Sequence, residues 1–167
     1  MKKRILLIGG GSGGHVMPNL VIATAIDSSC GPNSRPNSRP SSGNHNLVNN
    51  TGHNSILYIG SRKKLDRELV EAAGLKFKSI FTGKLRRYFS WRNFIDPIFV
   101  IIGFFQSFWI LIRFWPHVVF SKGGFVSVPV VLAAFILRRP IILHESDSVM
   151  GLANRIVAHF ADKICIS

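Results

Sequence analysis

The stretch RILLIGGGSGGH at residues 4–15 decides the fold, because it joins a short apolar run to a loop of glycines. A short apolar run that ends in glycine is typical of a buried strand in a parallel sheet. A helical pattern follows at 16–26. The apolar run is too short for the hydrophobic region of a signal peptide. We therefore interpret 4–8 as a first buried strand, followed by a glycine turn and a helix.

The same alternation continues along the chain. A helical pattern at 63–73 stops at Gly74, and the last residues, 163–167, resemble the opening of one more strand. Short apolar runs separated by helices indicate a parallel sheet covered on both faces. The sequence thus predicts an α/β, Rossmann-like, doubly wound domain over 1–167, with a missing continuation or partner. The other predicted strands are 55–59, 77–81, 118–120 and 141–143.

Composition limits the class of partner. The 167 residues fit one domain, and 21 Lys and Arg against 8 Asp and Glu give a net charge of +13. This charge favours anionic partners, namely phosphates, nucleic acid or acidic lipid. The hydrophobic fraction of 47% exceeds the need of a freely soluble domain. The two cysteines show no metal or disulfide spacing, which favours a reducing cytosolic compartment.

One segment departs from the pattern. Residues 28–54 are rich in Ser, Asn, Gly, Pro and Arg, and repeat PNSR at 32–39. This composition has almost nothing to bury, so we predict a disordered insertion. A passive insertion is favoured over a binding role for Arg35 and Arg39.

The first glycine loop, 9–15, allows close approach of a ligand to the backbone and to a helix N-terminus. Its glycines have the spacing of a dinucleotide loop. An NAD site also needs an acid near the end of the second strand, and 59–64 has none. The basic run 62–64 is best interpreted as a solvated first helical turn, but it would also suit an NADP phosphate, so a dehydrogenase stays open as an alternative.

Two further motifs follow later strands. SKGGFVSVP at 121–129 is a second glycine loop, and Lys122 beside it would suit a pyrophosphate held between the two loops. HESD at 144–147 follows the next strand, where His144 and Glu145 would orient one another or a ligand hydroxyl, and Asp147 is a candidate helix N-cap. No nucleophile–base triad or metal-binding constellation appears, which fits sugar transfer by placement, a base and charge stabilisation.

A basic aromatic segment precedes a long apolar one. KLRRYFSWRNF at 84–94 has no acid and is typical of a membrane surface. Single-stranded nucleic acid is disfavoured, because no RNA-binding motif accompanies it. The predicted membrane residues are Lys84, Arg86, Arg87, Tyr88, Phe89, Trp91, Arg92 and Phe94.

The apolar run 95–114 has the length of a membrane span, but polar residues interrupt it. A true span would also carry the next strand, 118–120, to the wrong side of the membrane. We predict a sheet-packed, partly membrane-buried helix, with a span as the open alternative.

Three motifs together resemble the MurG family of glycosyltransferases: GGGSGGHVMP at 9–18, GGFVSVP at 123–129, and HESD with GLANR within 144–155. The resemblance covers nearly the whole chain in order, except 28–54. It implies the N-terminal half of a GT-B fold. In this family that half takes the acceptor lipid I, and a C-terminal domain, absent here, takes UDP-N-acetylglucosamine.

The resemblance also implies the site. The loops at 11–15 and 123–127 would hold the acceptor diphosphate, and His15 is the candidate general base or acceptor-orienting group. A helix-start histidine bonded only to backbone is the alternative. The family has Tyr where this chain has Phe125, and Gln-Asn where it has Ser146 and Asp147. The implied substrate-binding residues are Gly11, Ser12, Gly13, Gly14, Lys122, Gly123, Gly124, Phe125, Ser127, His144, Glu145 and Asn154.

The implied activity is that of an inverting hexosyltransferase. It would transfer N-acetylglucosamine to lipid I (undecaprenyl-pyrophosphoryl-MurNAc-pentapeptide), forming lipid II for peptidoglycan synthesis. The enzyme would be peripheral at the cytoplasmic face of the cell membrane, inactive without a donor-binding half, and would need no cofactor and no metal. A membrane-anchoring acceptor subunit of a split transferase, and a non-catalytic membrane recruiter, are the alternatives.

Overall fold

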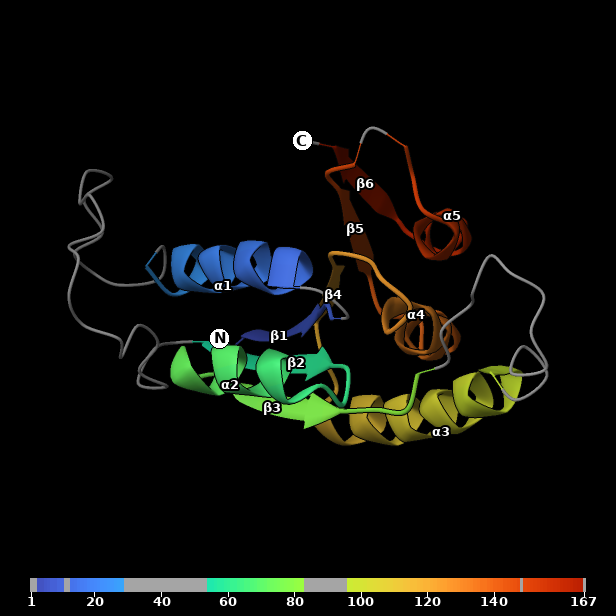
Figure 1. Ribbon diagram of the computed structural model, residues 1–167, viewed down its shortest axis with the longest axis horizontal. Helices are drawn as coiled ribbons and strands as arrows, with labels where there is room; N and C mark the ends of the chain where they lie inside the picture. Colours follow the sequence, from blue (N-terminus) through green and yellow to red (C-terminus); the bar gives the residue numbers. More distant parts are fainter. Residues whose placement is uncertain (1–2, 11–12, 29–53, 83–95, 148, 167) are drawn as a thin grey trace.

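The computed structural model describes residues 3–10, 13–28, 54–82, 96–147 and 149–166 (Figure 1). The predicted disordered insertion therefore lies outside the described residues, except for its ends. Ser28 ends the first helix and Asn54 begins the second strand, so these two residues do not belong to the insertion. All eight predicted membrane residues also lie outside the described part.

The fold is built on one six-stranded sheet in which every pairing is parallel. The strand order is β3-β2-β1-β4-β5-β6. Because β1 pairs with both β2 and β4, the chain winds outward in two directions from β1, which confirms the predicted doubly wound fold. The strands are β1 Lys3–Ile8, β2 Asn54–Gly60, β3 Lys76–Ser79, β4 Val118–Ser121, β5 Ile141–Glu145 and β6 Lys163–Ile166.

Five helices in the described residues cover the two faces of the sheet (Figure 1). Alternate residues of a strand point to opposite faces. Leu7 of β1 therefore packs with α1 and α2, whereas Leu6 packs with α3, α4 and α5, and both side chains are fully buried. The helices are α1 Gly13–Ser28, α2 Lys64–Ala72, α3 Asp96–Phe114, α4 Ser127–Ile136 and α5 Leu152–Ala158.

Two sequence predictions need adjustment at their ends. The first helix begins at Gly13 rather than at 16, so it starts inside the glycine loop. The third strand is Lys76–Ser79 rather than 77–81, because Phe81 leaves the ladder. The backbone N–H of Phe81 donates instead to Gln106 Oε1 on α3, at 2.9 Å. Gly74, with φ at +77°, ends the α2 segment as predicted.

The predicted helix over 95–114 is α3, which packs against the sheet through the fully buried Leu111. Much of the rest of α3 is exposed and apolar, including Ile98, Phe105 and Trp109. Among the described residues, no helix combines the length and the apolarity needed to cross a membrane.

Candidate functional site

Three sequence motifs meet at the carboxyl edge of the sheet. The first glycine loop follows β1, the second follows β4, and HESD lies at the end of β5. These strands are parallel neighbours, so their carboxyl ends lie side by side. The backbone N–H of Lys122 donates to the carbonyl of Ile8 at 3.0 Å, which joins the bases of the two loops. The expectation that both loops flank one place is thus met by their described residues.

The second glycine loop is held in a shape that only glycine adopts easily. Gly123 and Gly124 have φ of +96° and +85°, in the left-handed region. The Gly123 N–H donates to Ser121 Oγ at 3.2 Å, and the Ser121 hydroxyl donates to Ser127 Oγ at 2.8 Å. Ser127, also buried, begins α4, so these bonds connect the end of β4 to the helix that follows.

Lys122 is a buried cation at the centre of this edge. Its side chain is only 3% exposed, and Nζ lies 2.7 Å from Nδ1 of His144. Burial, and then the charge of Lys122, lower the pKa of His144, against the opposing effect of Glu145. A neutral imidazole that accepts at Nδ1 carries its proton on Nε2, so His144 remains a hydrogen-bond donor at that atom.

Glu145 supports the site from the other side of β5. Its Oε1 accepts the N–H groups of Ser146 and Asp147 at 3.0 and 3.1 Å, and its Oε2 accepts Asn154 Nδ2 at 2.7 Å. Burial would raise the pKa of Glu145, but these hydrogen bonds and the nearby Lys122 outweigh it, and the pKa is lowered. Both carboxylate oxygens are therefore occupied by the protein itself.

The prediction that His144 and Glu145 orient one another is wrong. Neighbouring residues of a strand point to opposite faces, so His144 lies on the α1 face, where its ring is near that of Phe120, whereas Glu145 lies on the α5 face. His144 contacts Lys122 instead. The Asp147 N-cap alternative is also wrong, because Gly151 is the N-cap of α5 and Asp147 is exposed.

Asn154 connects Glu145 to the glycine loop. It is 6% exposed, and a Cβ added to Gly123 would lie 2.2 Å from its Oδ1. Among the described residues, this Oδ1 has no hydrogen-bond partner. Phe125, in contrast, is half-buried and packs against the core of the α4 face.

The first loop is described in part. Gly9 and Gly10 are buried, Gly11 and Ser12 lie outside the described residues, and Gly13, Gly14 and His15 form the first turn of α1. The N-terminus of α1, which is the positive end of its dipole, thus lies at the carboxyl edge of the sheet.

Sequence reasoning missed the acid beside the first loop. Residues 59–64 contain no acid, but Asp66 in the first turn of α2 is 1% exposed and accepts a hydrogen bond from Ser61. A Cβ added to Gly10 would lie 2.9 Å from Asp66 Oδ2. The signal was an acid in the first turn of the next helix, two positions beyond residue 64. Its burial and its bond to Ser61 give it a structural role.

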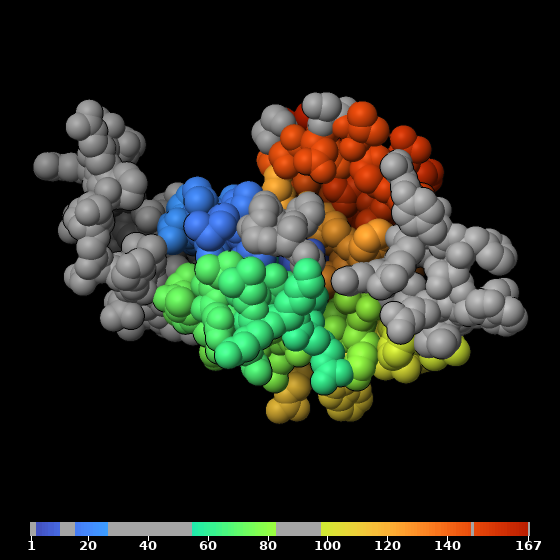
Figure 2. All heavy atoms as spheres, viewed as in Figure 1, coloured from blue at the N-terminus to red at the C-terminus, as the bar shows by residue number. Residues whose placement is uncertain are grey.

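The polar groups at this edge form two layers. Lys122, His144 and the start of α1 lie on one face of the sheet, whereas Ser121, Glu145 and Asn154 support the second loop from the other. In Figure 2, the α1 part, in blue, and the α4 and α5 parts, in orange and red, occupy different regions of the surface. A doubly wound sheet with glycine loops at its switch point is typical of Rossmann-like domains that bind phosphate-bearing ligands.

The chain belongs to glycosyltransferase family 28. The family described as "Glycosyltransferase family 28 N-terminal domain" matches residues 45–166. The chain is 43% identical over 165 residues to the UDP-N-acetylglucosamine--N-acetylmuramyl-(pentapeptide) pyrophosphoryl-undecaprenol N-acetylglucosamine transferase of Clostridium kluyveri, covering 99% of this chain and 40% of that protein. It is 45% identical over 160 residues to the protein of the same name from Shouchella clausii, and this match covers 96% of this chain and 39% of that protein.

Solved structures show the same fold. The crystal structure of MurG from Acinetobacter baumannii matches with a TM-score of 0.71 at 18% identity, over 98% of this chain and 41% of that one. The resemblance inferred from the three motifs and the predicted GT-B N-terminal half are thus confirmed. The family assignment also replaces the dehydrogenase alternative. The chain spans about 40% of the length of the curated relatives that it matches.

Proposed function

We propose that this chain is the acceptor-binding half of an inverting transferase that moves N-acetylglucosamine from UDP-N-acetylglucosamine onto lipid I. The relatives that share 43% and 45% of its residues carry the name of this activity. The donor is proposed to bind to a second half, which the relatives' greater length accommodates.

The observation that carries the proposal is the buried cation between the glycine loops. Lys122 is 3% exposed, and among the described residues its side chain makes its one hydrogen-bond contact with His144, whose pKa is lowered by burial and by Lys122 itself. The charge of Lys122 helps to lower the pKa of Glu145, but the oxygens of Glu145 are bonded to other groups. A buried ammonium of this kind is stabilised by an anion. The diphosphate of a lipid-linked sugar supplies one at the loops and the helix N-terminus.

The chemistry follows from this placement. Lys122 and backbone N–H groups would neutralise the diphosphate, and Nε2 of His144 would donate to it. Asn154 would act indirectly from the other face, where it bonds to Glu145 and lies against Gly123 of the second loop. His15, in the first turn of α1, would remove the proton from the attacking acceptor hydroxyl. That oxygen would then bond to the anomeric carbon of the donor as the bond to UDP breaks, inverting the configuration.

Attachment to the cytoplasmic face of the membrane is part of the proposal. The basic aromatic segment 84–94 leads directly into α3, whose exposed face is apolar along its length. Such a surface would sit at the headgroup boundary. The exposed side chains of α3 include Ile98, Ile101, Ile102, Phe105, Trp109 and Ile112.

The test is direct binding of a water-soluble, short-chain lipid I analogue to this chain by calorimetry. Removing the Lys122 charge by Lys122→Met should weaken binding at least tenfold, since a charged hydrogen bond contributes about 1.5–3 kcal/mol. Gly151→Ala is the matched control, because open space surrounds that position. An analogue with one phosphate should also bind more weakly.

Equal binding by wild type and Lys122→Met, or no preference for the diphosphate, would contradict the acceptor site. If the chain then still bound anionic vesicles, the recruiter alternative would remain.

A further inference from the structure

Asn19 is a buried polar side chain in a helix that is otherwise apolar. It lies in α1, is fully buried, and takes part in none of the contacts described above. It is the one buried polar residue within 16–26, the part of α1 whose side chains the structure describes. Burying an amide away from water is costly unless its polar atoms find partners. The partners of Asn19 therefore indicate what it does.

Apolar burial alone does not fix the rotation of α1 about its own axis. Val16 and Ala23 are fully buried in the core between α1 and the sheet. Met17 and Val21, however, are equally apolar and are 55% and 65% exposed. A helix that is apolar on every side gains similar burial whichever side faces the sheet. A directional contact is needed to specify one rotation.

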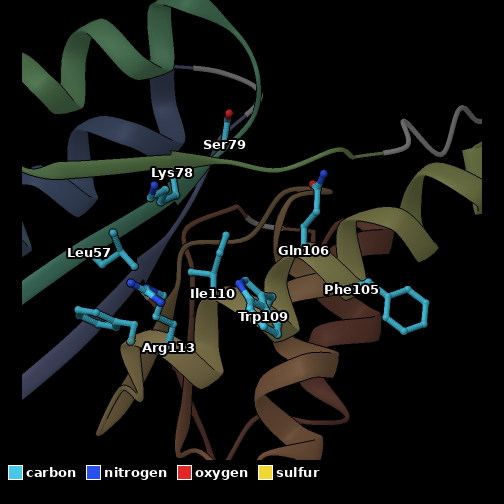
Figure 3. Close-up of a pocket in the computed structure, with 9 residues that line it drawn as sticks. Leu57, Lys78, Ser79, Phe105, Gln106, Trp109, Ile110 and Arg113 are labelled. Carbon is cyan, nitrogen blue, oxygen red and sulfur yellow. The ribbon is translucent and has the colours of Figure 1, made fainter.

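Asn19 supplies such a contact through its amide nitrogen. Its Nδ2 donates to the carbonyl of Ile8 at the end of β1, at 2.9 Å, and to the hydroxyl oxygen of Tyr58 on β2, at 3.3 Å. Alternate residues of β2 point to opposite faces, so Leu57 lines a groove beside α3 (Figure 3), whereas Tyr58 lies on the α1 face. Burial raises the pKa of Tyr58, so its phenol stays a neutral partner. Asn19 thus joins α1 to two neighbouring strands.

The Ile8 carbonyl also connects Asn19 to the second glycine loop. This carbonyl accepts the backbone N–H of Lys122 at 3.0 Å, so it receives one bond from α1 and one from the residue that carries the buried cation. A carbonyl oxygen has two lone pairs and can accept both bonds. The position of α1 relative to Lys122 is therefore set at this atom.

Pro18 makes this bond more important for the first turn of α1. Proline has no backbone N–H, so the helical bond from Pro18 to the carbonyl of Gly14 is missing, and the first turn is tied less firmly to the rest of the helix. Asn19 is the next residue along the chain. His15 precedes Asn19 by four positions, about one helical turn, on the same side of α1. An anchor at Asn19 thus acts on the turn that contains the candidate base.

The amide oxygen of Asn19 favours a role in placement over a role in stability. Its Oδ1 is buried and has no hydrogen-bond partner among the described residues. A buried amide that is only partly satisfied adds little to stability. A buried polar group can instead specify one arrangement among several that bury similar apolar area.

We propose that Asn19 is a positioning residue, which fixes the rotation of α1 through the Ile8 carbonyl and so places the first turn of α1 against Lys122. The inference rests on the proposed function, because this turn and Lys122 are the groups proposed to act on the acceptor. The contacts of Asn19 themselves do not depend on that function.

The variant that tests this role is Asn19→Leu/Tyr58→Phe, which replaces the contact between the two side chains by apolar groups of similar size. Ile8 keeps its bond from Lys122, so urea unfolding should stay close to that of wild type. Hydrogen exchange of the α1 amides, followed by mass spectrometry, should nevertheless become at least about fivefold faster, whereas exchange of α4 should not change. Binding of the lipid I analogue should weaken by about threefold to tenfold, the effect of one lost neutral hydrogen bond.

Two controls isolate the bond to Ile8. Val21→Leu places the same side chain at an exposed position of the same helix, and Tyr58→Phe alone removes the longer contact but leaves Asn19 bonded to Ile8. Both controls should bind the analogue within about twofold of wild type, and α1 should exchange as in wild type. Asn19→Ala adds no bulk and should act as the double variant does, which covers the case in which leucine cannot be accommodated.

Three outcomes would overturn the proposal: wild-type affinity in the double variant, unchanged exchange of α1, or an equal loss of affinity in Val21→Leu. If wild type itself did not bind the analogue, the acceptor site would be wrong. Faster exchange of α1 in the double variant would then still support Asn19 as the anchor of this helix, and unchanged exchange would exclude it.

Discussion

Replacing Gly123 by alanine tests the construction of the second glycine loop. At this position φ is +96°, and an added Cβ would lie 2.2 Å from Oδ1 and 2.4 Å from Nδ2 of Asn154. These neighbours cannot yield freely, because Nδ2 donates to Glu145 Oε2 at 2.7 Å. The methyl group must therefore either displace the Asn154 amide or move the loop backbone.

The magnitude follows from these two costs. A side chain in the left-handed region costs about 1–2 kcal/mol. Losing a hydrogen bond to a charged group costs about 1.5–3 kcal/mol. The smaller conformational freedom of alanine in the unfolded chain offsets about 0.4–1 kcal/mol. Gly123→Ala should therefore lower the free energy of unfolding by about 2–4 kcal/mol, a fall in Tm of roughly 5–15 °C for a domain of this size.

Urea unfolding followed by circular dichroism measures this change. Gly151→Ala is the matched control, because φ there is −66° and nothing lies within 4 Å of the added Cβ. It should alter stability by less than about 0.5 kcal/mol. The double variant Gly123→Ala/Asn154→Ala should lose at least about 1 kcal/mol less than the sum of the single variants. If the stability losses of the two single variants were additive, or if the Gly123→Ala protein were as stable as the Gly151→Ala control, the close contact between Gly123 and Asn154 would be refuted.

Three further changes test other parts of the molecule. Gly103→Ala should destabilise by about 2 kcal/mol in urea unfolding although alanine favours helices, because its Cβ would meet the carbonyl of Phe81; a gain in stability would contradict this packing. Since burial and Lys122 lower the pKa of His144, the unfolded state binds more protons near that pKa. Stability should thus fall as the pH drops below about 6.5, and His144→Gln should flatten this dependence; an unchanged slope would contradict it. Glu145→Gln should cost about 1.5–3 kcal/mol at pH 7, because an amide cannot accept all three N–H groups, and unfolding as in wild type would exclude this role.

Sequence patterns predicted the sheet well because its strands are short apolar runs between glycines. The strand at 141–143 was correct but too short: His144 and Glu145 continue β5 as polar residues, and apolar periodicity does not detect these. The third strand was placed too late because Phe81 is apolar, whereas β3 itself is KFKS. An edge strand with lysines on one face has the pattern of a surface loop, so apolar periodicity did not predict where β3 begins and ends.

The candidate site shows a second limit of sequence reasoning. The motifs predicted which residues gather at the carboxyl edge, because parallel strands end together, but not which residues contact one another. The contacts follow from the alternation of side chains between the two faces of the sheet, if this alternation is continued beyond the last apolar residue of each strand. On β4, Val119 and Ser121 are buried on the α4 face, which places Lys122 on the α1 face. The same alternation on β5 places His144 on the α1 face, within reach of Lys122. A residue that directly follows β4 and a residue of the adjacent strand β5 thus meet on the α1 face, the one place at this edge where a helix N-terminus, a glycine loop and a buried cation coincide among the described residues.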